Sequence, residues 1–159
     1  MNGANDAVVD TGDVQAMINE DAVGIQAVDL LSETTDVDAA DMLSVVMGTF
    51  MQTNSATADG AGAVFNPATN TLDVDPNHYN YLADGESVVL EYQYDVTDGN
   101  GSTITQNATV TIEGSNDAPT VSSVNPVTLI EGNTGTADVQ TVNIFADLVT
   151  VTDLSLIHI

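Results

Sequence analysis

Residues 87–96 and 103–113 place an apolar side chain at nearly every second position. Successive side chains of a β-strand point to opposite faces, so this period of two predicts two strands that each have one apolar face. The apolar positions are Val88, Leu90, Tyr92, Tyr94 and Val96 in the first stretch and Ile104, Ala108, Val110 and Ile112 in the second. The turn-forming sequence Asp98-Gly99-Asn100-Gly101 lies between the two stretches, which predicts an antiparallel hairpin.

Five earlier segments are rich in β-branched and apolar residues and are separated by Asp, Asn, Gly or Pro. They are residues 14–18, 23–31, 43–51, 63–65 and 71–74. About seven short strands with turns between them predict an all-β fold, namely a Greek-key β-sandwich of the immunoglobulin or cadherin-like type. Residues 23–31 are also compatible with a short helix.

The start of the chain is repeated near its end. Gly3-Ala4-Asn5-Asp6-Ala7 matches Gly114-Ser115-Asn116-Asp117-Ala118 at an offset of 111 residues, and Glu20 and Glu131 follow at the same offset. This period fits one sandwich domain of about 100 residues and predicts a tandem array. We expect residues 1–9 to be the end of a preceding repeat, 10–118 a complete repeat and 119–153 the truncated start of the next. Residues 154–159 resemble the translation of a sequencing-library adapter and are excluded from the fold.

The charge of the chain is unusually one-sided, with 24 Asp and Glu residues, no Lys or Arg and a formal net charge of −24. Carboxylates that converge in one loop therefore need a divalent cation, because salt screens only distant charges. The lack of basic residues argues against nucleic acid and acidic membranes as partners. A hydrophobic content of 43% indicates a packed core rather than disorder.

Other sequence features concern the cellular location. Cysteine is absent, so neither a disulfide nor a thiolate metal site can stabilise the fold, and calcium is the expected substitute. We find no signal-peptide pattern at the start and no run of 18 apolar residues. No membrane insertion is expected, and the secretion signal of an exported parent protein would lie outside this fragment.

The turn Thr97-Asp98-Gly99-Asn100-Gly101, the linker Gly114-Ser115-Asn116-Asp117-Ala118-Pro119 and the opening segment 19–45 resemble VCBS-type, cadherin-like bacterial repeats. The resemblance covers most of residues 14–119. It implies a tandem extender or adhesion module of a large, calcium-stiffened protein that a type I system exports to the bacterial cell surface. Neighbouring repeats of the same chain would be its partners.

Calcium binds six to eight oxygen ligands, which loops at the end of a sandwich can supply. The candidate ligands are Glu20, Asp36, Asp38, Asp95, Asp98, Asn116, Asp117 and, in the next repeat, Glu131. Asp41 and Asp21 are less favoured. The twelfth residue counted from Asp36 or Asp95 is not Glu, so neither segment is an EF-hand. Each candidate is also a common turn residue, which leaves a solvated turn as the competing interpretation.

We do not expect an enzyme. The chain lacks Cys and Lys nucleophiles, and His78 lies in a polar turn without a nucleophile-elbow pattern. A carboxylate-based hydrolase fragment is the less favoured enzyme class, because its paired acids would need a shielded cleft.

The competing non-enzymatic function is a glycan- or protein-binding sandwich whose partner is a host or matrix glycan or protein. Its stacking platform would be Tyr79, Tyr81, Tyr92 and Tyr94. Tyr92 and Tyr94 share a strand face with Val88 and Leu90, however, which favours packing in the core.

Overall fold

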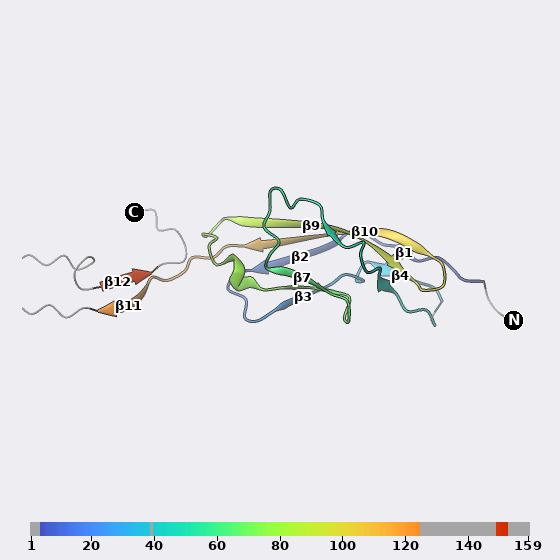
Figure 1. Cartoon of the computed structure of the whole chain (residues 1–159), viewed down its shortest axis with the longest axis horizontal. Coiled ribbons are helices and arrows are strands. Elements are labelled where there is room, and N and C mark those ends of the chain that lie inside the picture. The colour runs from blue at the N-terminus through green and yellow to red at the C-terminus, as the bar shows by residue number, and fades with distance from the viewer. Residues whose placement is uncertain (1–3, 39, 125–148, 153–159) are drawn as a thin grey trace, which may run out of the picture.

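The structure is a computed structural model that describes residues 4–38, 40–124 and 149–152. These residues form an all-β fold in which two sheets face each other (Figure 1). One short 3-10 turn, Pro76–Tyr79, interrupts the strands, and its cap is the Asp75 side chain, which accepts the backbone N–H of Asn77. In the described part of the chain, no helical segment has the length and apolar character needed to cross a membrane.

The larger sheet has the strand order β2-β10-β9-β5, and β6 also pairs with β9. Its centre is the predicted hairpin: β9 (Ser87–Thr97) and β10 (Thr103–Glu113) pair antiparallel along their whole length. The strand β2 (Val14–Asn19) pairs in parallel with β10. On the other side, the short strands β5 (Ser44–Val45) and β6 (Met51–Gln52) pair with β9.

The smaller sheet has the order β3-β8-β7, with β3 at Gln26–Asp29, β8 at Thr71–Val74 and β7 at Ala63–Asn66. A further pair joins β1 (Val9–Asp10) to β4 (Thr34–Thr35). The strands β11 (Thr120–Val124) and β12 (Val149–Thr152) form another two-stranded pair beyond the sandwich sequence. The predicted all-β sandwich is confirmed.

The core lies between the two sheets, on the faces that the alternating pattern predicted. The buried residues of β9 and β10 include Leu90, Tyr92, Tyr94, Val96, Ala108, Val110 and Ile112. The smaller sheet contributes Val28, Leu72 and Val74. Phe50 stacks against Phe65 and Tyr92, with ring centroids 4.9 Å apart in both pairs. This aromatic cluster joins the two sheets.

Gln106 is fully buried on the same face of β10, although it is polar. Its Nε2 donates to the backbone oxygen of Gly12 at 2.9 Å, and its Oε1 accepts the N–H of Asn107 at 2.8 Å. A buried amide is tolerated when its hydrogen bonds are satisfied. Gln106 therefore fixes the chain at Gly12, where it passes from β1 to β2.

The structure corrects three details of the strand prediction. The alternative of a helix at residues 23–31 is excluded, because this segment contains β3. The predicted segment 43–51 is not one strand, because it contains β5 and the first residue of β6 with a turn between them, in which Gly48 has φ +94°. The two-residue strands β1 and β4 were not predicted, since two residues are too short to show a period.

The loop that follows β4 and the turn between β9 and β10 lie at one end of the sandwich, and the segments that follow β2 and β10 lie at the opposite end (Figure 1). We define the N-terminal pole as Asn5, Asp6, the loop 36–38 and 40–41, and the turn 97–102. We define the C-terminal pole as Glu20, residues 82–86 and residues 113–117. The antiparallel run of β9 and β10 separates the two poles.

Candidate metal centre

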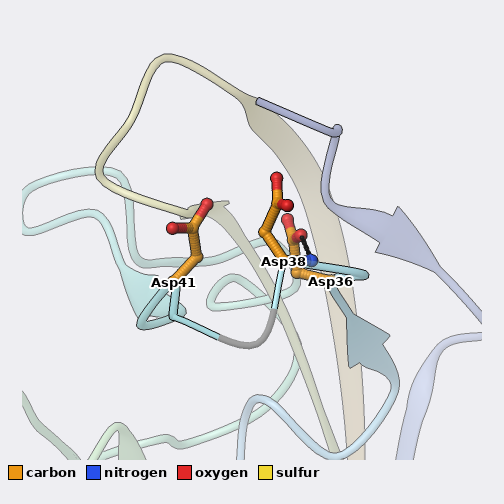
Figure 2. Close-up of side chains that lie close together, drawn as sticks. All are labelled: Asp36, Asp38 and Asp41. Carbon is orange, nitrogen blue, oxygen red and sulfur yellow. Dashed lines mark hydrogen bonds between the residues drawn. The ribbon is translucent and has the colours of Figure 1, made fainter. Parts of the chain in front are cut away.

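Three carboxylates converge at the N-terminal pole. Asp36, Asp38 and Asp41 each offer one oxygen, and these oxygens lie within 4.8 Å of one another. Their carboxyl groups point to the same side of the loop that follows β4 (Figure 2). Two hydrogen bonds close the loop. The backbone N–H of Asp38 donates to Asp36 Oδ1 at 2.8 Å, and the backbone N–H of Asp41 donates to the backbone oxygen of Asp38 at 2.9 Å. This backbone turn brings the third acid back to the first two.

Asp98 orders the neighbouring turn between β9 and β10, and only 3% of its surface is exposed. Its Oδ1 accepts the backbone N–H groups of Asn100, Gly101 and Ser102 at 2.7, 3.0 and 3.0 Å. Its Oδ2 accepts Nδ2 of Asn5 at 2.9 Å. These donors, and the Asn5 side chain most of all, lower the pKa of Asp98 below its ordinary value. Asp98 is therefore a carboxylate at neutral pH.

The segment that precedes β1 crosses the N-terminal pole. Besides the bond from Asn5 to Asp98, the backbone N–H of Asp6 donates to Asp38 Oδ2 at 2.7 Å. The N–H of Val8 donates to Ser102 Oγ at 3.1 Å. The linker segment is thus attached to both acidic loops of this pole.

The N-terminal pole has oxygens that no group of the described chain satisfies. Asp36 Oδ2 and Asp41 Oδ2 are buried and have no hydrogen-bond partner. Asn100 Nδ2 donates to the other oxygen of Asp41 at 2.7 Å, but this donor is neutral. Buried carboxylate oxygens without a partner are unfavourable, and the chain has no Lys or Arg to pair with them. Oxygen-only ligands of this kind fit calcium, a hard cation.

A second acidic group, a pair of carboxylates, lies at the C-terminal pole. Glu20 is 1% exposed, its Oε1 accepts the N–H of Ser115 at 2.6 Å, and its Oε2 is buried without a partner. Asp117 Oδ2 is likewise buried and unpartnered. Burial is the main cause that raises the pKa of Glu20, and the charges of Asp117 and Asp21 add to it. Two carboxylates that repel each other, each with one buried oxygen that no described group satisfies, again fit a shared cation.

Five of the eight predicted ligands fall into two groups in space. Asp36 and Asp38 lie together at the N-terminal pole beside Asp98, whereas Glu20 and Asp117 lie together at the C-terminal pole. Asn116 is exposed, and its Nδ2 contacts only the backbone oxygen of Asp117, at 3.5 Å. Asp95 lies on the outer face of β9, where Thr105 Oγ1 donates to its Oδ1 at 2.8 Å. Glu131 lies outside the described residues.

Asp41 was less favoured from the sequence, yet it belongs to the group of three. Its place in the group depends on the backbone turn after Asp38, which the spacing of the acids does not reveal. Two further residues of this pole were not predicted from the sequence as part of the site: Asn5, which donates to Asp98, and Asn100, which donates to Asp41. The sequence signal for Asn5 was that Asn5-Asp6 is repeated as Asn116-Asp117.

The described residues do not form the stacking platform of four tyrosines that the competing interpretation required, and Tyr92 and Tyr94 pack in the core as their strand face predicted. Tyr79, Tyr92 and Tyr94 are buried in the core, and Tyr81 alone of the four is exposed, at 49%. His78 lies at the surface, where its Nε2 is 3.1 Å from Asp59 Oδ2.

No protein-family model and no curated protein sequence matches the chain. Several solved structures are similar to it. The protocadherin gammaB7 EC3-6 cis-dimer structure matches 77% of the chain at 15% identity with a TM-score of 0.41. The protocadherin gammaB4 extracellular domain matches 93% at 13% identity with a TM-score of 0.39. A nucleoside hydrolase-related hypothetical protein from Saccharophagus degradans, associated with carbohydrate metabolism, matches 70% at 14% identity with a TM-score of 0.38.

The chain spans about a quarter of the length of these proteins, namely 27%, 24% and 26%. The sheets and the two poles by themselves define a class of protein, namely an all-β sandwich module with acidic ends.

Proposed function

We propose that residues 10–118 are a calcium-stabilised extender or adhesion repeat of a large bacterial cell-surface or secreted protein. One observation carries the proposal: both poles hold buried carboxylate oxygens that have no partner among the described residues, in a chain that contains no Lys or Arg. A bound divalent cation neutralises such groups. In this proposal the module has no catalytic role and acts outside the cell, where calcium is abundant.

At the N-terminal pole, we assign the ligand role to Asp36, Asp38 and Asp41. Asp98 adds negative charge beside them and holds the turn in shape. Because calcium requires six to eight oxygens, backbone carbonyls and water would complete the shell. Sites of this kind in extracellular modules bind calcium with a Kd of about 10⁻⁴–10⁻³ M.

The repeated linker connects the two poles of successive modules. Asn5 and Asp6 contact the pole of the module that follows them, through Asp98 and Asp38. Asp117, at the equivalent of Asp6, lies beside Glu20 of the module that precedes it. One linker would therefore serve two poles, and calcium at each junction would restrain the angle between neighbouring repeats. These neighbouring repeats are the proposed partners.

The test is thermal unfolding of the whole chain in chelator, in calcium and in magnesium, together with isothermal titration. Calcium at about one hundred times its Kd should stabilise the fold by about 2.7 kcal/mol for each independent site. A double variant, Asp36→Asn with Asp38→Asn, should lose most of the calcium response of the N-terminal pole. Glu91→Gln removes the same kind of charge from an exposed position of β9 and should keep the full response. An equal melting temperature in chelator and in calcium would contradict the proposal.

A further inference from the structure

Asn100 and Gly101 are exposed in the turn between β9 and β10. Gly101 has φ +123°, and apart from its two chain neighbours no described residue has an atom within 4 Å of the place where a Cβ would stand. An asparagine followed by glycine is the sequence in which the next backbone nitrogen most easily attacks the asparagine side chain, because glycine has no side chain to obstruct it. The turn therefore presents the residue pair that is most prone to deamidation.

Two carboxylates of the N-terminal pole hold both reacting groups. Asp98 Oδ1 accepts the N–H of Gly101 at 3.0 Å, and this is the nitrogen that must lose its proton to attack. Asp41 Oδ1 accepts Nδ2 of Asn100 at 2.7 Å, and Nδ2 is the atom that must leave. Asp98 also accepts the N–H of Asn100 at 2.7 Å, which fixes the backbone between the two groups. A carboxylate that accepts an N–H makes its deprotonation harder.

We propose that Asn100 is a site of spontaneous deamidation, which Asp98 and Asp41 restrain while the N-terminal pole is closed and which proceeds when the pole opens. The Gly101 nitrogen forms a bond to Cγ of Asn100. The bond from Cγ to Nδ2 breaks, and ammonia leaves with the proton that Gly101 gives up. Water then opens the five-membered imide at either carbonyl, which gives aspartate or isoaspartate. No oxidant or reductant takes part.

The product changes the pole permanently. An aspartate at position 100 replaces the donor to Asp41 with a second carboxylate, in a chain whose formal net charge is already −24. An isoaspartate also lengthens the backbone by one carbon, which displaces the three N–H groups that Asp98 accepts. Deamidation at Asn100 therefore follows an opening of the turn and prevents the original hydrogen bonds of Asp98 and Asp41 from forming again.

The restraint of deamidation by Asp98 and Asp41 is inferred from their hydrogen bonds alone, whereas a dependence of the rate on calcium rests on the proposed function.

The experiment incubates the whole chain in mildly alkaline buffer and follows Asn100 by peptide mass spectrometry and by isoaspartyl methyltransferase labelling. The reaction should be slower in the folded chain than in urea. It should accelerate several-fold in Asp98→Ala and in Asp41→Ala, and Asn100→Gln should abolish the signal at this position.

Asn54 is the internal comparison, because serine follows it and both ends of its side chain are bound, Oδ1 by the N–H of Glu91 and Nδ2 by the Val89 oxygen. Its rate should stay low in every folded variant. Circular dichroism shows whether Asp98→Ala folds, and if it does not, Asp41→Ala decides. Equal rates at Asn100 in the wild type and in the folded variants would overturn the proposal, as would a wild-type rate equal to that in urea.

Calcium gives a separate result. We expect calcium to slow the reaction in the wild type, because it closes the pole. If the variants accelerate deamidation but calcium does not slow it, the restraint by Asp98 and Asp41 is supported and the closing of this pole by calcium is contradicted.

Discussion

Asn5 and Asp98 are joined by a hydrogen bond of 2.9 Å from Nδ2 to Oδ2, although 93 residues separate them in the chain. The bond attaches the segment before the first strand to the turn between the two longest strands. It also lies beside the three converging carboxylates, since the next residue, Asp6, donates its N–H to Asp38. The position of the linker and the shape of the acidic pole are therefore coupled.

Asn5→Asp tests this coupling. The substitution replaces the donor that faces Asp98 with a carboxylate, so the two groups repel each other in chelator. We expect the melting temperature to fall in chelator and calcium to restore most of the loss, because the cation is attracted by the additional charge. Thermal unfolding in both conditions measures the effect. Asn5→Ala is the control: it also loses the hydrogen bond, but calcium should restore less of its stability.

Glu20→Gln should stabilise the protein in chelator but not in calcium. In chelator the variant should be more stable than the wild type, because the buried charge and its repulsion from Asp117 disappear while the amide oxygen can still accept the N–H of Ser115. In calcium the advantage should vanish, since the C-terminal pole has lost an anionic ligand. Urea denaturation in each condition provides the measurement. A variant that is less stable in chelator would show that Glu20 needs no cation.

Tyr94→Phe and Tyr92→Phe form a matched pair in the core. The hydroxyl of Tyr94 donates to the buried backbone oxygen of Leu30 at 2.7 Å, whereas the hydroxyl of Tyr92 is buried without a partner. Tyr94→Phe leaves the oxygen of Leu30 unsatisfied and should lower the free energy of unfolding by about 1–3 kcal/mol. Tyr92→Phe removes an unsatisfied group and should be neutral or stabilising. Urea denaturation of the two variants compares them directly, and equal losses would contradict this assignment.

Buried tyrosines should make the protein sensitive to alkali. Burial raises the pKa of Tyr92 from 10.0 to about 12, and burial also raises the pKa of Tyr79 and Tyr94. Above pH 10 the unfolded chain therefore loses protons that the folded chain keeps, so the free energy of unfolding should fall as the pH rises from about 10 to about 12. Denaturation at several pH values measures the slope. The slope should be shallower in Tyr92→Phe, and phenolate absorbance should show that unfolding accompanies the titration.

The long strands could be predicted from the sequence because they are amphipathic over eleven residues each. Their alternating pattern predicted the two strands and their inward faces, including the burial of Tyr92 and Tyr94. The sequence Asp98-Gly99-Asn100-Gly101 predicted the turn that joins them into a hairpin. Strands of two residues, such as β1 and β4, carry no such pattern. They form because long-range packing brings Val9 and Asp10 beside Thr35 and Thr34.

The amino-acid sequence by itself determined the fold class and the lack of basic partners for its acids, since both follow from local alternation and from composition. It also marked Asp36 and Asp38 as neighbours, because an acidic pair two residues apart in a loop is a local feature. Only the tertiary structure decided that Asp41 joins them, that Asp117 lies beside Glu20 and that Asp95 lies elsewhere. Electrostatic interactions between carboxylates depend on distance through space, and that distance is set by how the chain turns and by which loops the two sheets bring to the same end.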